Sequence, residues 1–138
     1  MQTNLELDEK VLNDAAQAIG DGPVVMVNLL SYRDTPNYPA NFTAAKSDSR
    51  SGYHEGYVGG FRRACAELGI TPELLYAGVR VATLLGGQGD NWDEVAIVRY
   101  ARFADLRRLL TSDIYIREAK PHRLAVLADW RFIATRGR

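Results

Sequence analysis

The order of predicted strands and helices constrains the fold of this chain more than any other feature of its sequence. Strand-like runs, rich in β-branched and aromatic residues, occupy 24–32, 74–85, 92–100 and 129–135. Apolar residues at helical spacing occupy 51–68, 105–110 and 113–127, with a break predicted near Pro121. The resulting order β-α-β-β-α-β predicts an α+β, ferredoxin-like antiparallel sheet with its helices on one face.

Two further segments extend this core. Apolar residues recur at helical spacing over 8–19, and a glycine follows them as a natural helix end. The 33–50 segment is a loop rich in proline and small polar residues, and a loop of this length is often a lid or a partner-contact arm. We therefore expect a single domain over 1–138, made of an N-terminal helical extension at 1–22 and a ferredoxin-like core at 23–138.

The second predicted strand is apolar on both faces. One face carries Leu75, Ala77, Val79, Val81, Thr83 and Leu85. The opposite face, also largely apolar, carries Leu74, Tyr76, Gly78, Arg80, Ala82 and Leu84. Because helices cover only one face of such a sheet, the other face needs a second layer. The sequence therefore predicts a homodimer that forms through the sheet face.

Charge and cysteine content exclude several classes of partner and site. The 17 basic and 17 acidic side chains give a net charge of zero, so no global field favours nucleic acid or an anionic membrane. Cys65 is the only cysteine, which excludes an internal disulfide and a cysteine-based zinc site. The first residues lack a basic region followed by an apolar run, and no stretch approaches the roughly 20 apolar residues of a membrane span. We therefore expect a cytoplasmic protein.

Three short motifs resemble the dimeric α/β-barrel superfamily, and within it proteins of the DUF1330 type. They are Val27-Asn28-Leu29-Leu30 in the first strand, the run WDEVAIVRY at 92–100, and Pro121-His122-Arg123 before the last strand. The resemblance covers 23–135, and the 33–50 loop and the N-terminal helix are longer than in compact members of that family. It implies a ligand cleft between the sheet and its own helices. It also implies several chemistries, from cofactor-free oxygenation, cyclisation and isomerisation to haem-dependent reactions, so the fold alone selects none of them.

Three residues form the predicted catalytic group: His122, Asn28 and Tyr57. An unperturbed imidazole titrates near neutrality, and His122 follows a proline at a helix break, where its side chain can face a cleft as general acid or base. Asn28 is in phase with apolar side chains, so its carboxamide either orients a substrate oxygen or makes a structural hydrogen bond. The alternative for His122 is also structural, as a cap of backbone carbonyls or a partner of Asp129.

Four residues form the predicted substrate-binding group: Arg99, Trp92, Tyr53 and Arg80. Tyr53 and Tyr57 are one helical turn apart, and each has an apolar ring with a polar tip that suits an aromatic or oxygenated ligand. An arginine within a strand must reach solvent, a carboxylate or an anionic ligand. We expect Arg99 to bind a substrate carboxylate, and Arg80 either to do so or to pair with an acid across the dimer. Core packing is the alternative role for the aromatic residues.

His54, the other histidine, is shifted by one residue from the apolar stripe of its helix, which places it at the surface or at the rim of a site. Two histidines without an acidic companion at metal spacing predict no metal site. Haem ligation by either histidine is allowed by the resemblance, although the sequence has no attachment motif.

These observations predict a small-molecule enzyme that uses general acid/base chemistry and needs no cofactor. Cyclisation, isomerisation or oxygenation of a polar-aromatic or polyketide-like compound fits a histidine beside groups that steady an enolate oxygen. Two alternatives stay open: a non-catalytic small-ligand-binding or stress-related dimer, and a haem-binding protein.

Overall fold

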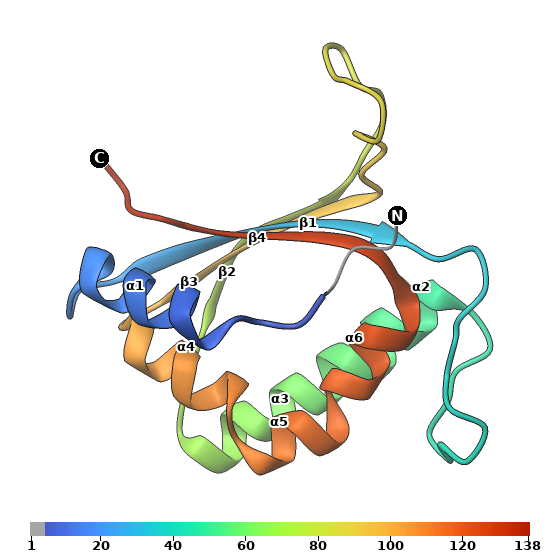
Figure 1. Cartoon of the computed structure of the whole chain (residues 1–138), viewed down its shortest axis with the longest axis horizontal. Helices are drawn as coiled ribbons and strands as arrows, with labels where there is room; N and C mark the ends of the chain where they lie inside the picture. The colour runs from blue at the N-terminus through green and yellow to red at the C-terminus, as the bar shows by residue number, and fades with distance from the viewer. Residues whose placement is uncertain (1–4) are drawn as a thin grey trace.

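A four-stranded antiparallel sheet forms one layer of the molecule, and the helices of the described residues lie on one side of it (Figure 1). The computed structural model describes residues 5–138. Residues 1–4, part of the N-terminal segment in which the sequence shows no secretory signal, lie outside the described residues. The strands are β1 (Val24–Tyr32), β2 (Glu73–Val79), β3 (Glu94–Tyr100) and β4 (Leu127–Thr135), in the order β2-β3-β1-β4. The predicted ferredoxin-like fold is confirmed.

The helical elements begin and end close to the residues that the sequence predicts. They are α1 (Glu9–Ile19), α2 (Ser49–Ser51), η1 (Gly52–Tyr57), α3 (Val58–Leu68), α4 (Phe103–Leu110), α5 (Asp113–Glu118) and α6 (Lys120–Val126). Asp8 caps α1 by accepting a hydrogen bond from the backbone N–H of Lys10 at 2.8 Å. The predicted helix break falls at Ala119, and Pro121 stands in the first turn of α6, where a missing N–H costs no intrahelical bond.

Two glycines allow the predicted helix at 51–68 to pack closely against its neighbours. This helix contains a π-helical turn, η1, between α2 and α3. A Cβ atom at Gly56 would overlap the imidazole ring of His122, and one at Gly60 would overlap the backbone of Glu118. Interiors are packed too tightly to absorb such an overlap. Close packing at Gly56 and Gly60 therefore depends on the absence of a side chain, and at Gly56 it brings η1 against α6.

The hydrophobic core lies between the sheet and the helices. Side chains of β1 alternate, so that Val24, Met26, Asn28 and Leu30 are buried on the helix side. One cluster joins the start of β1 to α4 and α5 through Val24, Met26, Leu106, Leu109, Ile114 and Tyr115. A second cluster joins the end of β1 to α6 and β4 through Leu30, Ala125, Val126, Leu127 and Trp130.

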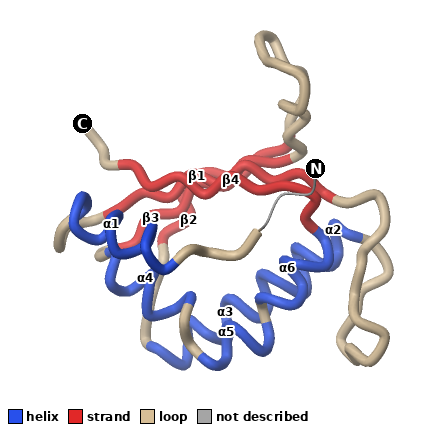
Figure 2. The backbone as a smooth tube through the Cα atoms, in the orientation of Figure 1, coloured by secondary structure: helices blue, strands red, loops and turns tan. Residues whose placement is uncertain are grey.

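The prediction of a strand over 74–85 is wrong in its second half. Pairing with β3 ends near Val79, and one further backbone hydrogen bond joins Arg80 N to Asp93 O at 2.9 Å. Residues 80–93 then leave the sheet as a loop that projects away from the helices (Figures 1 and 2). Val81, Leu84 and Leu85 are 92%, 95% and 97% exposed, so nothing within one described chain covers the apolar pattern that predicted a strand.

The helix-free face of the sheet is also apolar, as the sequence predicts. Residues paired across β1, β3 and β4 place the side chains of Val27, Ile97 and Ile133 side by side on it. Ile133 is 47% exposed, and no helix of residues 5–138 crosses this face (Figure 1). Residues 5–138 therefore supply no second layer on this face.

Candidate functional site

Three polar side chains meet where β1 ends and β3 begins: Tyr32, His54 and Glu94. The two strand ends adjoin because Leu30 pairs with Glu94 in the sheet, and His54 reaches them from η1. Nε2 of His54 lies 2.9 Å and 3.1 Å from the two carboxylate oxygens of Glu94. The hydroxyl of Tyr32 donates to Glu94 and lies 3.5 Å from Nε2 of His54. We call these residues the Tyr32–His54–Glu94 cluster.

The environment of the cluster differs from one member to the next. Glu94 is buried, with 8% of its surface exposed, whereas the side chain of His54 is about half exposed. Burial, followed by the hydrogen bond to Glu94, raises the pKa of Tyr32, so its hydroxyl stays protonated and keeps donating. The guanidinium of Arg50 covers the Tyr32 ring at 4.8 Å and lies 3.8 Å from Asp93. Carboxylates, phenol and imidazole are thus held in one network.

This network leaves one ring nitrogen of His54 for other partners. Because Nε2 faces the carboxylate, the neutral tautomer that donates to Glu94 carries its lone pair on Nδ1. Within residues 5–138, Nδ1 of His54 makes no hydrogen bond. A histidine oriented by a carboxylate on one nitrogen, with the other nitrogen open, has the arrangement of a general base.

The sequence predicts that His54 lies at the surface or at the rim of a site, but it does not predict the contact between His54 and Glu94. Two signals point to the connection. Glu94 is in phase with Ala96 and Tyr100, so its carboxylate enters the helix side of the sheet, where a charge needs a partner. Tyr32 continues the helix-facing phase of Asn28 and Leu30 to the end of the strand. The irregular path of η1, which sets the direction of His54, has no comparable signal in the sequence.

His122 is buried under the long loop, at 3% exposure. Its Nδ1 lies 2.6 Å from the hydroxyl of Tyr38, and the rings of Tyr38 and Phe42 meet its edge or face at 5.4 Å and 5.2 Å. Gly56 of η1 backs the ring on another side. Burial, together with the positive charges of Lys46 and Arg63, lowers the pKa of His122. The imidazole is therefore held neutral beneath a closed loop.

Asn28 and Tyr57 find their partners away from His122. The amide of Asn28 donates to the Ala96 carbonyl at 3.2 Å and accepts from the Trp130 indole at 3.0 Å, which ties β1 to β3 and β4. The hydroxyl of Tyr57 lies 2.9 Å from that of Tyr115. Burial, and then the neighbouring Tyr115, raise the pKa of Tyr57. Hydrogen bonding therefore does not join the three predicted catalytic residues into one group.

Of the predicted substrate-binding residues, one lies beside the cluster. Tyr53 meets the Tyr32 ring at 5.9 Å and the His54 ring at 5.4 Å. Burial, and then the neighbouring Tyr115 and Glu94, raise the pKa of Tyr53, so its hydroxyl stays a donor. The rings of Tyr32 and Tyr53 therefore lie next to the imidazole of His54.

The other three predicted binding residues lie elsewhere. Arg99 belongs to the helix-free face and pairs with Glu73 at 3.9 Å. Arg80 donates to the backbone carbonyl of Trp92 at 2.7 Å. The Trp92 ring in turn lies under the guanidinium of Arg131 at 5.0 Å. These contacts belong to the base of the projecting loop and to the outer face.

Two classes of feature are missing from the described part of the chain. Its histidine, cysteine and acidic side chains nowhere gather in a group of three that would hold a metal ion. Among residues 5–138, every helix is too short or too polar to cross a bilayer.

Comparison with known proteins identifies the fold but no family. No protein-family model matches the chain, and no curated protein matches it. The structure is similar to that of RPA0582, a protein of unknown function from Rhodopseudomonas palustris, with 24% identity, a TM-score of 0.81, and coverage of 98% of this chain and 97% of that one. The methylated form of RPA0582 gives a TM-score of 0.83 at 24% identity, with coverage of 100% and 97%.

A more distant likeness gives the fold a name. A dabb family protein from Mesorhizobium loti, described as having a ferredoxin-like fold, is 8% identical, with a TM-score of 0.53 over 85% of this chain and 98% of that one. The chain thus has the ferredoxin-like fold of these structures.

Proposed function

We propose that this chain is a small-molecule enzyme that works by general acid/base chemistry, with His54 as the base. The observation that carries the proposal is the pairing of Nε2 of His54 with a buried carboxylate, Glu94, at 2.9 Å and 3.1 Å. A buried carboxylate that accepts from the Tyr32 phenol and from the imidazole holds that imidazole in one orientation, as a general base requires.

The proposed reaction begins with a proton transfer to Nδ1 of His54. The proton comes from a carbon next to a carbonyl group, which leaves an enolate on the substrate and an imidazolium on the enzyme. The carboxylate of Glu94 stabilises that imidazolium at Nε2. Return of the proton from the imidazolium to a different atom completes an isomerisation. In a cyclisation the enolate carbon adds to a second carbonyl group of the same molecule, the C=O π bond opens to an alkoxide, and the imidazolium returns its proton to that alkoxide. Neither route needs an oxidant, whereas oxygenation of the enolate consumes O₂.

The proposed substrate is an enolisable compound of the polar-aromatic or polyketide-like class. Tyr53 supports this choice, because its ring stands 5.4 Å from that of His54 and stacks at 5.1 Å on the ring of Tyr57. Flat aromatic substrates pack well against such rings, at roughly 0.5–1.5 kcal/mol per pair beyond simple burial.

His122 is the second candidate base for the same function. Its lowered pKa keeps the imidazole neutral, as a base requires, and Tyr38 supplies a hydroxyl at Nδ1. The loop that carries Tyr38 and Phe42 must open before a substrate reaches this ring. That requirement ranks His122 below the half-exposed His54.

The test uses 2-tetralone, an aromatic ketone, as a probe of proton abstraction. Exchange of its α-hydrogens in D₂O is followed by NMR with the wild-type protein, His54→Gln, Glu94→Gln and His122→Gln. We expect the wild-type protein to accelerate exchange and both cluster variants to lose about 100-fold or more of that acceleration. We expect His122→Gln to retain it when circular dichroism shows an unchanged fold.

Two results would contradict the proposal. Loss of exchange in His122→Gln alone would show that the buried His122, and not His54, is the general base. Equal exchange with the wild-type protein and with the double variant of both histidines would remove acid/base catalysis on this substrate class altogether.

We further propose that the working form is a homodimer that forms through the helix-free face. Support comes from the apolar side chains of Val27, Ile97 and Ile133 on that face and from the exposed leucines of the 80–93 loop. A second copy covers these groups without disturbing the Tyr32–His54–Glu94 cluster, whose side chains lie on the opposite side of the sheet.

A further inference from the structure

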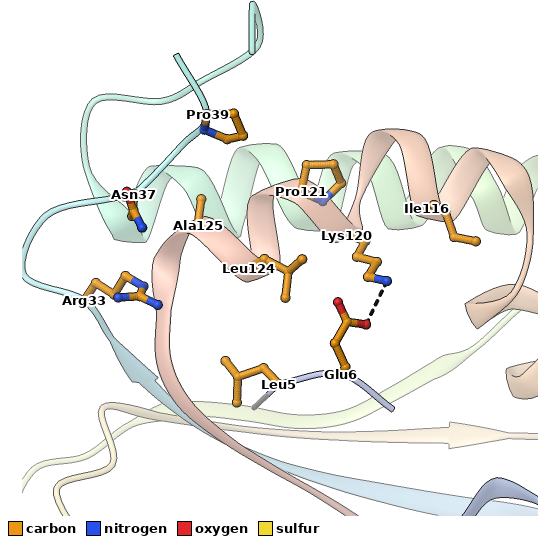
Figure 3. Close-up of a pocket in the computed structure, with 10 residues that line it drawn as sticks. All are labelled: Leu5, Glu6, Arg33, Asn37, Pro39, Ile116, Lys120, Pro121, Leu124 and Ala125. Atoms are coloured by element: carbon orange, nitrogen blue, oxygen red, sulfur yellow. Dashed lines mark ion pairs between the residues drawn. The ribbon is translucent and has the colours of Figure 1, made fainter. Parts of the chain in front are cut away.

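A large open pocket lies beside α6, between the start of the chain and the long loop (Figure 3). Its volume is about 790 Å³. Most of the lining is apolar and comes from Leu5, Pro39, Ile116, Pro121, Leu124 and Ala125. Its polar members are Glu6, Arg33, Asn37 and Lys120. An apolar pocket with a few charged groups is the usual form of a small-molecule site.

The pocket has more positive than negative charge. Glu6 is its single lining acid, and its carboxylate lies 2.8 Å from Nζ of Lys120. The guanidinium of Arg33 points toward Leu5 and Leu124 (Figure 3). Its Nε is buried and has no hydrogen-bond partner among residues 5–138. Residues 1–4 contain no acidic side chain, so they hold no carboxylate for it either.

A second arginine lies next to the pocket and is buried. Arg123 is 2% exposed, its Nη1 donates to the backbone carbonyl of Leu5 at 2.6 Å, and its guanidinium lies over the Trp130 ring at 4.7 Å. Its Nε has no partner among the described residues. An unmet buried donor costs roughly 1–3 kcal/mol, and more when it is charged. Each of these two arginines therefore has an Nε that is unpaired within residues 5–138, and each carries a positive charge that an anion can pair with.

Residues 5–7, the N-terminal strap, contact Arg123 through the Leu5 carbonyl and line the large pocket with Arg33 through Leu5 and Glu6. Glu6 and Lys120 line the large pocket and also a smaller one of about 190 Å³ that contains Arg123. The Glu6 side chain therefore stands at the boundary between the two spaces. If it moves aside, Lys120 loses its partner and faces the same opening as Arg33 and Arg123.

We propose that this pocket binds a small organic carboxylate with an apolar or aromatic body. Until such a ligand binds, the strap occupies the position of its carboxylate group, and the ligand displaces the strap when it binds. The Glu6 carboxylate and the Leu5 carbonyl stand in for the oxygens of the ligand at Lys120 and Arg123. Arg33 supplies a further charge that the strap leaves unpaired. The apolar body of the ligand lies against Leu124 and Ile116. The inference is independent of the proposed function, because it uses none of the residues of the Tyr32–His54–Glu94 cluster.

The test measures the binding of 2-naphthoate and of its neutral analogue 2-naphthamide to the full chain by isothermal titration calorimetry. We expect the wild-type protein to bind the carboxylate about tenfold more tightly than the amide. Arg33→Gln should remove most of that preference. Glu6→Gln should strengthen naphthoate binding by several-fold, because it weakens the competing ion pair with Lys120. Arg62→Gln, which removes the same charge from an exposed position on α3, is the matched control and should bind like the wild-type protein.

The outcomes separate the proposal from its alternatives. Equal affinity for acid and amide would overturn it, and so would a loss in Arg62→Gln as large as the loss in Arg33→Gln. Weaker binding by Glu6→Gln would show that the strap is part of the site and does not compete for it. Glu6 is half exposed, so its substitution leaves a folded protein even if Arg33→Gln is unstable.

Discussion

The hydroxyl of Tyr38 lies 2.6 Å from Nδ1 of His122, and this contact fastens the long loop to α6. Two backbone hydrogen bonds precede it in the loop, from Arg33 N to the Val126 carbonyl and from Asn37 N to the Ala125 carbonyl, each 2.8 Å. Beyond Tyr38 the loop runs on to α2 without regular structure (Figure 2). The Tyr38–His122 contact is therefore the central attachment of this segment.

Tyr38→Phe should loosen the loop while leaving its packing in place. The substitution removes the hydrogen bond with His122, worth about 1 kcal/mol, together with the one that the hydroxyl accepts from the backbone N–H of Lys46, and it keeps the stacking on Phe42 at 5.5 Å. We expect faster amide hydrogen exchange across residues 34–48 and faster tryptic cleavage at Lys46. Tyr76→Phe removes a hydroxyl from an exposed tyrosine of β2 and should change neither rate. Unchanged exchange in Tyr38→Phe would show that the backbone bonds alone hold the loop.

Acid should destabilise the protein through His122. Burial lowers its folded-state pKa below the ordinary value of 6.5, so the unfolded chain binds the proton more readily. The free energy of unfolding is therefore largest above pH 6.5 and falls as the pH drops from 6.5 toward the folded-state pKa. Protonation also removes the acceptor for Tyr38, and Lys46 and Arg63 oppose the new charge.

Urea unfolding between pH 5 and 8 checks this dependence. His122→Gln should flatten the curve over that range. Identical slopes in wild-type and His122→Gln proteins would contradict the assignment.

Two glycine substitutions three residues apart should have opposite signs. A methyl group at Gly56 overlaps the His122 ring, and relief of that overlap must separate η1 from α6, so Gly56→Ala should lower the free energy of unfolding by about 1–3 kcal/mol. At Gly59 the nearest atom is the end of the Arg63 side chain at 3.5 Å. Gly59→Ala should therefore stabilise the helix, by up to about 1 kcal/mol. Thermal unfolding measures both, and a shared sign would refute the packing argument.

The proposed dimer predicts that a charge on the helix-free face produces monomers. Val27 lies on β1 opposite Ile97 and Ile133, at the middle of that face. Val27→Glu buries an unpaired charge in the interface, which the dimer cannot accommodate. Light scattering should give twice 15.3 kDa for the wild-type protein and 15.3 kDa for the variant. Val11→Glu, on an exposed position of α1, should stay dimeric, whereas a monomeric wild-type protein at micromolar concentration would end the proposal.

The periodicity of single elements was predictable from the sequence, and the pairing between elements was not. The period of two in β1 correctly placed Asn28 among buried residues, because that alternation follows from strand geometry alone. The partners of its amide, Ala96 and Trp130, depend on strand register, which the sequence left open. The same holds for His54 and Glu94, which are 40 residues apart in the sequence and meet between η1 and the start of β3.

The loop at 80–93 shows a different limit. Its apolar alternation predicted a strand that the structure does not continue beyond Val79, because pairing needs a neighbour and β3 begins only at Glu94. A pattern in one chain cannot tell whether the surface that covers it belongs to the same chain.

Tyr38 stands between Asn37 and Pro39, and both of these neighbours line the large pocket while Tyr38 reaches over α6 to His122. Residues 37–39 therefore link the binding of a ligand in the pocket, on one side of the seven-residue helix α6, to the protonation of His122 on the other side. Thermodynamic reciprocity then fixes the relation between the two events: whatever factor a bound carboxylate applies to the proton affinity of His122, a proton on His122 applies to the affinity for that carboxylate.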